Sequence, residues 1–272
     1  MANKDVPNSY SMFANVYSYM GLPLSRNVES ADVVVMGIPY DIGTTGRAGT
    51  RHGPQGVRLA SGNLRWEEKR WPWQFSVMDR LKVIDYGDLE FKPSESNSMI
   101  ETVIEHVGAV HAKGKKALCF GGDHFVTLPL LRAAHQHHGP VALVHFDAHT
   151  DTYTPEDDGA ENYDHGCMFY HAPKEGLIDP DHSIQVGIRT EYDTQSHLFE
   201  VVDAAAANDL SSADVVAAIK RRVGSMPVYL TFDIDCLDPA YAPGTGTPVV
   251  GGITTDRALK IIRGLQGLNI VG

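Results

Sequence analysis

The sequence predicts an α/β fold in which helices cover both faces of a mainly parallel sheet. Short runs rich in β-branched residues alternate with segments of helical periodicity along the 272 residues. Such alternation is typical of parallel sheets, whose strands are buried on both faces. Clusters of carboxylates and imidazoles also follow three of the strand-like runs. Functional groups gather at this carboxyl edge in open α/β sheets.

The strand-like runs are short and apolar, and several end at Gly or Pro. In ADVVVMGIP (31–39), three consecutive valines precede a Gly and a Pro, which favours a buried strand. Strands are expected over residues 31–39, 82–88, 116–122, 141–148, 183–188 and 226–235, and LNIV (268–271) begins another.

The segments between the strands show helical spacing. Ile100, Val103 and Val107 recur on one helical face, and Gly114 is expected to end that helix. Ser212 is expected to cap a later helix whose last turn is basic and so interacts favourably with the helix dipole. Helices are expected over residues 97–112, about 126–138, 214–223 and 254–264. Because no repeat, low-complexity tract or linker interrupts the pattern, one domain over residues 1–272 is expected.

Composition limits the classes of partner. The formal net charge of -11 argues against a general nucleic-acid or anionic-membrane binder. It is compatible with a cationic small-molecule substrate, although solubility alone is a sufficient reason for it. The N-terminus MANKDVPNSY has no apolar signal region, and no apolar run approaches the ~18 residues of a membrane span. The three widely spaced cysteines indicate reduced thiols in a cytoplasmic protein.

The stretch VHFDAHTDTY (144–153) places acidic and imidazole side chains at every second position after an apolar run. In an extended segment these positions point to the same side. A second pair follows the run that ends at Phe232, and GGDH (121–124) ends a third run. So many carboxylates would repel one another unless cations neutralised them. Two divalent ions, Mn²⁺ rather than a zinc–thiolate site, would fit the following set: His124, Asp147, His149, Asp151, Asp233 and Asp235.

Each of these motifs alone has an ordinary structural explanation. An Asp-x-Asp pair is common in loops, and a histidine after a strand is more often a hydrogen-bonded core residue than a ligand. The three motifs together, each at a strand end, favour the metal site over coincidence.

The sequence resembles the ureohydrolase (arginase and agmatinase) family, and within it the bacterial agmatinases. The matching motifs are GRAGTRHGP (46–54), GGDH (121–124), DAHTDTY (147–153), DHGCMFYHA (164–172) and FDIDCLDPAYAPGTGTPVVGG (232–252). The resemblance implies an arginase-like three-layer αβα sandwich. It also implies two Mn²⁺ ions per subunit, hydrolysis of a guanidino compound to urea and an amine, and a homotrimer or homohexamer.

The resemblance also implies roles for individual residues. Asp147 and Asp233 would bridge the two ions, with His124 and Asp151 completing one site, and His149 and Asp235 the other. Asp151 would also orient a metal-bridging hydroxide and accept its proton.

Two more residues match positions in the family's substrate site. His165 matches a mobile histidine that carries protons to the leaving amine; without the resemblance it would be read as a surface-loop histidine. An imidazole suits this work because it can exchange protons near pH 7. Thr247 matches a residue lining the substrate site; otherwise it would be a turn residue in a Gly-rich loop.

The substrate prediction depends on Tyr153. Arginases carry an asparagine at this position, where it contacts the α-carboxylate of their substrate. A phenol there indicates a substrate without that carboxylate, so the expected reaction is hydrolysis of agmatine to putrescine and urea, a step of polyamine biosynthesis. Tyr153 could instead simply pack in its loop, and guanidinobutyrate is the alternative substrate.

The last residues, LNIVG (268–272), depart from the family pattern. In relatives this strand continues, and a glutamate that pairs with the substrate guanidinium and a terminal helix follow it. A metal-binding but catalytically impaired member, with a role in assembly or regulation, is therefore a second hypothesis.

Overall fold

Every strand pair in the described structure is parallel, as the alternation of strands and helices predicts. The computed structural model describes residues 17–67, 69, 71–155 and 163–272, so the N-terminus in which no signal segment is expected lies outside it. In the first sheet, β1 (Val33–Ile38) lies between β2 (Val83–Asp88) and β3 (Lys116–Gly121).

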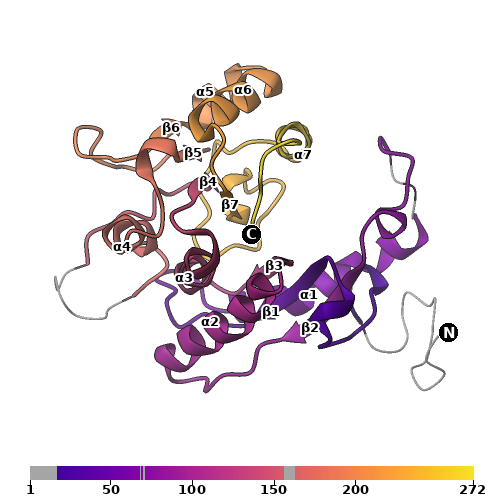
Figure 1. Cartoon of the computed structure of the whole chain (residues 1–272). Coiled ribbons are helices and arrows are strands. Elements are labelled where there is room, and N and C mark those ends of the chain that lie inside the picture. Colours follow the sequence, from indigo (N-terminus) through magenta and orange to yellow (C-terminus); the bar gives the residue numbers. More distant parts are fainter. Residues whose placement is uncertain (1–16, 68, 70, 156–162) are drawn as a thin grey trace.

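The second sheet contains four strands in the order β6-β5-β4-β7. Their bounds are β4 (Ala142–Phe146), β5 (Ile184–Val186), β6 (Glu200–Val202) and β7 (Val228–Phe232). The strand expected from residue 268 is represented by a parallel bridge between Val228 and Ile270. It lies beside β7, where the chain reaches its C-terminus between the two sheets (Figure 1).

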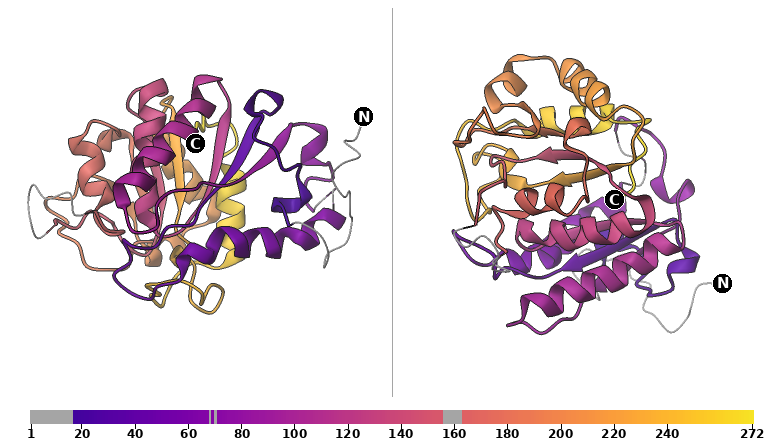
Figure 2. Two further views of the ribbon diagram at one scale, coloured as in Figure 1. Left: turned by 90° about the horizontal axis from the view of Figure 1, so that it is seen from below. Right: turned by 60° about the vertical axis from the view of Figure 1, so that its left-hand side comes forward.

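Helices cover both faces of the strands and give the three layers of an αβα sandwich (Figures 1 and 2). Consecutive residues of β4 point to opposite faces of the sheet. Leu143 belongs to the core formed with α2, α3 and α4, whereas Val144 belongs to the core formed with α6 and α7. The α/β fold class is confirmed. The helices are α1 (Gly53–Ala60), α2 (Ser96–Ala112), α3 (Thr127–His138), α4 (Met168–Lys174), α5 (Ala204–Asp209), α6 (Ser212–Val223) and α7 (Thr255–Gly264).

Two expectations about local structure are corrected. Ser211, and not Ser212, is the N-cap of α6, because its hydroxyl accepts a hydrogen bond from the backbone N–H of Asp214 at 3.1 Å. No helix is expected between the strands at residues 141–148 and 183–188, but this segment contains α4, a short helix with Pro173 inside it.

Further expectations concern membranes and thiols. Within the described part of the chain, no helix is both long and apolar enough to cross a membrane. Cys119, Cys167 and Cys236 all carry free thiols, as their spacing predicts.

Candidate metal centre

Three strand ends deliver the acidic and imidazole side chains to one place. After β3, Asp123 caps the 3-10 turn η6 (His124–Val126), which brings His124 inward. After β7, Asp233 caps the 3-10 turn η8 (Ile234–Cys236) by accepting a hydrogen bond from the backbone N–H of Asp235 at 3.0 Å. Asp147 directly follows β4. The predicted convergence at the carboxyl edge is therefore present.

The segment after β4 does not stay extended. Asp151 has φ of 52°, in the left-handed region that Asp tolerates better than most residues. The strict alternation assumed for residues 147–151 is thus wrong beyond Asp147. The turn still directs Asp147 and Asp151 toward one point and places His149 beside a different partner, Asp235.

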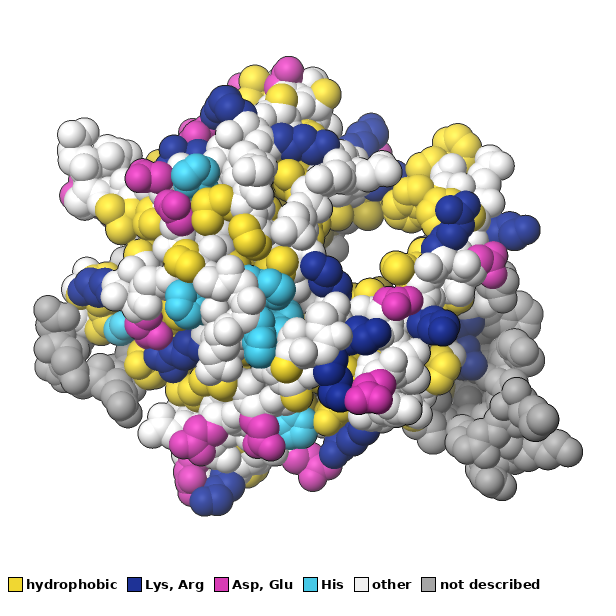
Figure 3. Space-filling model, viewed as in Figure 1, with side chains coloured by type: hydrophobic (Ala, Val, Ile, Leu, Met, Phe, Trp, Pro, Cys, Tyr) yellow, Lys and Arg dark blue, Asp and Glu magenta, His cyan; other side chains and the backbone are white. Residues whose placement is uncertain are grey.

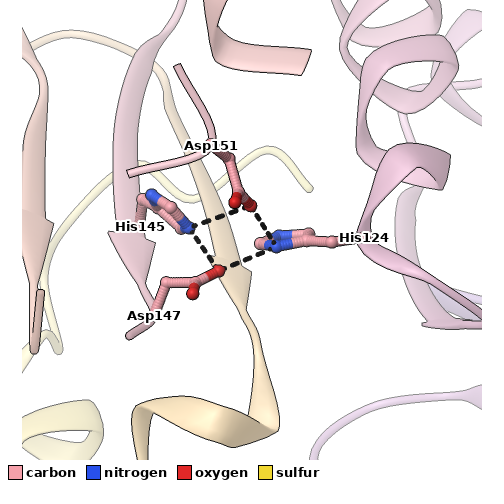
Figure 4. Close-up of side chains that lie close together, drawn as sticks. All are labelled: His124, His145, Asp147 and Asp151. Atoms are coloured by element: carbon pink, nitrogen blue, oxygen red, sulfur yellow. Dashed lines mark hydrogen bonds and ion pairs between the residues drawn. The ribbon is translucent and has the colours of Figure 1, made fainter. Parts of the chain in front are cut away.

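The first group of potential ligands surrounds His124 (Figure 4). Its Nδ1 lies 2.9 Å from Asp147 Oδ2, 2.9 Å from Asp151 Oδ2 and 3.3 Å from Asp233 Oδ2. This buried nitrogen has no hydrogen-bond partner of ordinary geometry among the described residues. The other ring nitrogen, Nε2, is 2.7 Å from the Thr231 hydroxyl, so Nδ1 faces the carboxylates. One nitrogen and several carboxylate oxygens facing a common point are the donors of a cation site.

A second group adjoins the first. His149 Nδ1 lies 3.3 Å from Asp147 Oδ1 and 3.1 Å from Asp235 Oδ2. The two groups therefore share Asp147, which presents Oδ2 to the first and Oδ1 to the second. Asp233, the other expected bridge, presents Oδ2 to His124 and uses Oδ1 to accept from the Asp235 amide.

The electrostatics of the cluster favour a bound cation. Burial and the charge of Asp147 raise the pKa of Asp151 well above its usual range. Burial, then Asp147 and Asp235, raise the pKa of Asp233 to about 7. Burial opposes ionisation of Asp147 too, but three imidazoles, with His145 the strongest, hold its pKa well below the usual range. In the described ranges no Lys or Arg forms an ion pair with these carboxylates.

His145 lies within reach of the first group but is not one of the expected ligands, and the sequence reasoning missed it. It is fully buried on β4, and its Nε2 lies 2.9 Å from Asp147 Oδ2 (Figure 4). Extending the alternating pattern one step toward the N-terminus, from Asp147 to residue 145, would have identified it.

The predicted proton carrier, His165, is held by the loop after β1. Its Nε2 lies 2.9 Å from the backbone nitrogen of Thr45 and 2.6 Å from the Thr45 hydroxyl, and the backbone N–H of His165 donates to Gly43 O at 3.1 Å. Burial lowers its pKa. It is thus a half-buried, bonded residue and not a free surface-loop histidine.

Thr247 and Tyr153 lie in different surroundings. The Thr247 hydroxyl is 3.3 Å from Asp235 Oδ2, which places it beside the second ligand group. Tyr153 is 44% exposed, and its hydroxyl is 3.3 Å from that of Thr190. The structure therefore brings Thr247 to the carboxylates, while Tyr153 stands toward solvent.

Arg189 fixes the segment that carries Asp235. Its guanidinium donates to the backbone carbonyls of Asp235 at 2.6 Å, Val249 at 2.7 Å and Gly187 at 3.0 Å. These bonds tie η8 to the end of β5 and to the loop that carries Thr247.

A cavity of ≈ 760 Å³ lies elsewhere, beside α1. Arg51, Arg58 and Asp88 are among its lining residues, and none of the expected ligands lines it. Its arginines are already paired with carboxylates, so its chemistry does not compete with that of the His/Asp groups.

Comparison with known proteins agrees with this geometry. Residues 31–272 match the model of the arginase family. The agmatinase of Proteus mirabilis is 58% identical over 264 residues, which is 96% of this chain and 85% of the relative. A hypothetical agmatinase from Burkholderia thailandensis has a TM-score of 0.92 and 46% identity, covering 96% of this chain and 82% of the other.

A second solved structure extends the comparison to another activity. Proclavaminate amidino hydrolase from Streptomyces clavuligerus has a TM-score of 0.89 and 38% identity, covering 96% of this chain and 88% of the other. These matches confirm the resemblance given by the sequence motifs. The chain belongs to the arginase family.

Proposed function

We propose that this protein hydrolyses agmatine to putrescine and urea with two Mn²⁺ ions. The observation that carries the proposal is the pair of His/Asp groups sharing Asp147, in a chain closely similar to agmatinases. Oxygen and nitrogen donors without thiolates favour Mn²⁺ over a zinc–thiolate site, and Mg²⁺ seldom takes histidine. One ion would be held by His124, Asp147, Asp151 and Asp233, and the other by Asp147, His149, Asp233 and Asp235.

When bound, two such ions would lower the pKa of a shared water enough to supply hydroxide near neutral pH. Asp151 would orient this nucleophile and accept its proton, because its Oδ2 faces the cluster 2.9 Å from His124 Nδ1. His165 would relay a proton to the leaving amine, taking up the proton that Asp151 has accepted and returning to its neutral form when it delivers one. Because its Nε2 accepts from the backbone N–H of Thr45, the neutral ring carries its proton on Nδ1.

The acidic site suits a guanidinium, which stays protonated with a pKa above ~12. Fixed carboxylates stabilise such a cation while its carbon is attacked. Thr247, bonded to Asp235, would line the path of the guanidinium. Tyr153, exposed at 44%, would meet the far end of the substrate, where agmatine carries an amine and no carboxylate.

The test is urea release from agmatine by Mn²⁺-loaded protein, with arginine and 4-guanidinobutyrate as comparators and the metal-free protein as control. We expect urea from agmatine only, together with two equivalents of bound Mn²⁺. If urea came mainly from 4-guanidinobutyrate, that compound and not agmatine would be the substrate. Two bound Mn²⁺ without urea from any of the three would favour the catalytically impaired alternative.

We further propose a cytoplasmic homotrimer or homohexamer acting in polyamine biosynthesis, because putrescine is a polyamine. The free thiols of the described chain are compatible with a reducing compartment. Light scattering after size-exclusion chromatography would give the subunit number directly, and a monomeric mass would contradict the assembly.

A further inference from the structure

A buried chain of hydrogen bonds leads from the shared carboxylate Asp147 to a histidine outside the ligand groups. Asp147 Oδ2 is 2.9 Å from His145 Nε2, and His145 Nδ1 is 2.9 Å from the Gln185 amide nitrogen. The same amide nitrogen lies 2.7 Å from Thr150 O, and Gln185 Oε1 lies 2.8 Å from His197 Nε2. His145, Gln185 and Thr150 are all fully buried.

These contacts leave one consistent arrangement of protons. Thr150 O can only accept, so the atom of Gln185 that faces it must be the amide nitrogen. The second proton of that nitrogen points to His145 Nδ1, which must therefore be unprotonated. Gln185 Oε1 is then free to accept from His197 Nε2. A neutral His145 with Nδ1 unprotonated carries its proton on Nε2, which donates to Asp147.

This donation fixes the orientation of the shared carboxylate. The backbone N–H of His149 donates to Asp147 Oδ1 at 2.7 Å, so each oxygen is bound by a separate donor. One oxygen faces the His124 group and the other faces the His149 group. A carboxylate that serves two ions must hold this rotation, and partners outside the ligand set commonly provide such control.

We propose that His145 is a positioning residue for the metal centre, held by Gln185 in the tautomer that donates to Asp147. The proposal rests on the proposed function, because it assigns Asp147 as the carboxylate shared by two ions. Gln185 acts one step further out by accepting from His197 and donating to Thr150 and His145.

The competing explanation is packing. The His145 ring lies 4.6 Å from the ring of Phe169 and 5.2 Å from that of His124, measured between centroids. A ring of this size could be required only to fill space. His145→Phe keeps an aromatic ring and removes the donor, whereas His145→Gln removes the ring and keeps an amide N–H near the position of Nε2.

The first experiment measures Mn²⁺ affinity of the full-length variants by the electron paramagnetic resonance signal of free Mn²⁺. We expect His145→Phe to weaken binding by roughly 10–100-fold, with His145→Gln between it and the wild type. The exposed His182→Gln is the matched control and should bind like the wild type. Equal or tighter binding by His145→Phe than by His145→Gln would show that packing, and not hydrogen-bond donation, is the requirement.

The second experiment needs neither metal nor substrate nor a stable variant at position 145. A long-range ¹H–¹⁵N spectrum of the metal-free wild-type protein reports which ring nitrogen of each histidine carries the proton. We expect His145 as the pure Nε2–H form, and we expect Gln185→Leu to introduce the other tautomer. A wild-type Nδ1–H form would overturn the proposal even if agmatine hydrolysis is confirmed, and absence of urea with the expected tautomer would reject only the proposed function.

Discussion

Arg58 and His124 each contact a buried carboxylate, Asp85 and Asp151, but the partners of these two carboxylates differ. Asp85 on β2 is fully buried and receives Arg58 Nε at 2.8 Å, Arg58 Nη2 at 3.0 Å and the backbone N–H of Tyr19 at 2.8 Å. Asp151 is only 4% exposed and faces an imidazole and other carboxylates. We call these the arginine cluster (Arg58, Asp85, Asp88) and the ligand cluster (His124, Asp147, Asp151, Asp233).

The difference appears in the pKa values. Burial would raise the pKa of Asp85, but Arg58 and backbone donors hold it below the usual range. The pKa of Asp151 is raised well above that range because burial is joined by like charges. Burial of a carboxylate at a strand is therefore not itself a sign of metal binding. The informative feature is a buried carboxylate group whose charge the protein leaves uncompensated.

The largest expected effect comes from removing the carboxylate that both ligand groups share. Asp147→Asn should abolish Mn²⁺ binding at two sites and lower urea release by at least ~1000-fold, because the nucleophile depends on the ions. Metal analysis after dialysis and the urea assay check this. Asp181→Asn, at an exposed position, is the control. If Asp147→Asn retained two equivalents of Mn²⁺, Asp147 would not be a ligand of the metal centre.

The next largest effect is expected from removing the cation of the arginine cluster. Arg58→Met should lower the free energy of unfolding by about 3–5 kcal/mol, because it leaves a buried charge on Asp85 without its partner. Urea denaturation of the metal-free protein measures this. Arg26→Met, at a largely exposed pair with Glu90, should change stability by less than about 0.5 kcal/mol.

Mn²⁺ affinity tests whether the arginine cluster and the ligand cluster are independent of each other. The fraction of Arg58→Met that remains folded should bind Mn²⁺ like the wild type, since Arg58 contacts no expected ligand. Loss of Mn²⁺ affinity in folded Arg58→Met would mean that the clusters are coupled.

The sequence predicted the ligand cluster better than the arginine cluster, for a physical reason. Asp147, His149 and Asp151 lie within five residues, so local geometry brings them together and their spacing is visible. Arg58 and Asp85 are 27 residues apart and meet only through folding. His165 and Thr45 are 120 residues apart, so the bond that holds the imidazole could not be anticipated from spacing.

The same reason explains which helices and strands could be predicted from the sequence. The strands with continuous apolar runs were predicted nearly to their bounds, whereas the short helices α1 and α4 were missed, as were β6 and α5. β6 has three residues, and α5 has six, most of them alanine. Neither is long enough to show a period, and their stability depends on packing against the rest of the molecule.

A third kind of buried group, an imidazole without a carboxylate partner, gives a smaller and pH-dependent effect. His111 is 4% exposed, and burial, then the charges of His138 and His137, lower its pKa to about 4. Its pKa in the unfolded chain is near 6.5. Between pH 4 and 6.5, the imidazole is therefore more protonated in the unfolded state than in the folded state. Stability should therefore fall as pH drops from 6.5 to 4, by up to ~3 kcal/mol.

His111→Leu removes the titrating group and should flatten this part of the curve. The measurement is the free energy of unfolding from urea titrations at several pH values, compared between the two proteins. Parallel curves for wild type and His111→Leu would mean that the imidazole is not buried in its neutral form.

The smallest effect is expected at a second arginine, Arg51. Like Arg58, it pairs with a buried carboxylate, but its own side chain is much more exposed. Arg51 Nε lies 2.6 Å from Asp41 Oδ1, and the Asp41 side chain is about as buried as those of Asp147 and Asp151. The Arg51 side chain, however, is 49% exposed, and the backbone N–H of Gly49 also donates to Asp41 at 2.9 Å. Water and this amide can replace much of what Arg51 supplies.

Arg51→Met should therefore lower the melting temperature by roughly less than half the shift of Arg58→Met. Thermal unfolding of the two metal-free variants, followed by circular dichroism under one set of conditions, compares them directly. Equal shifts would mean that removing a guanidinium partner costs the same whether or not water reaches it. In that case, burial could no longer explain the raised pKa values of Asp151 and Asp233, and repulsion among the carboxylates alone would have to account for them.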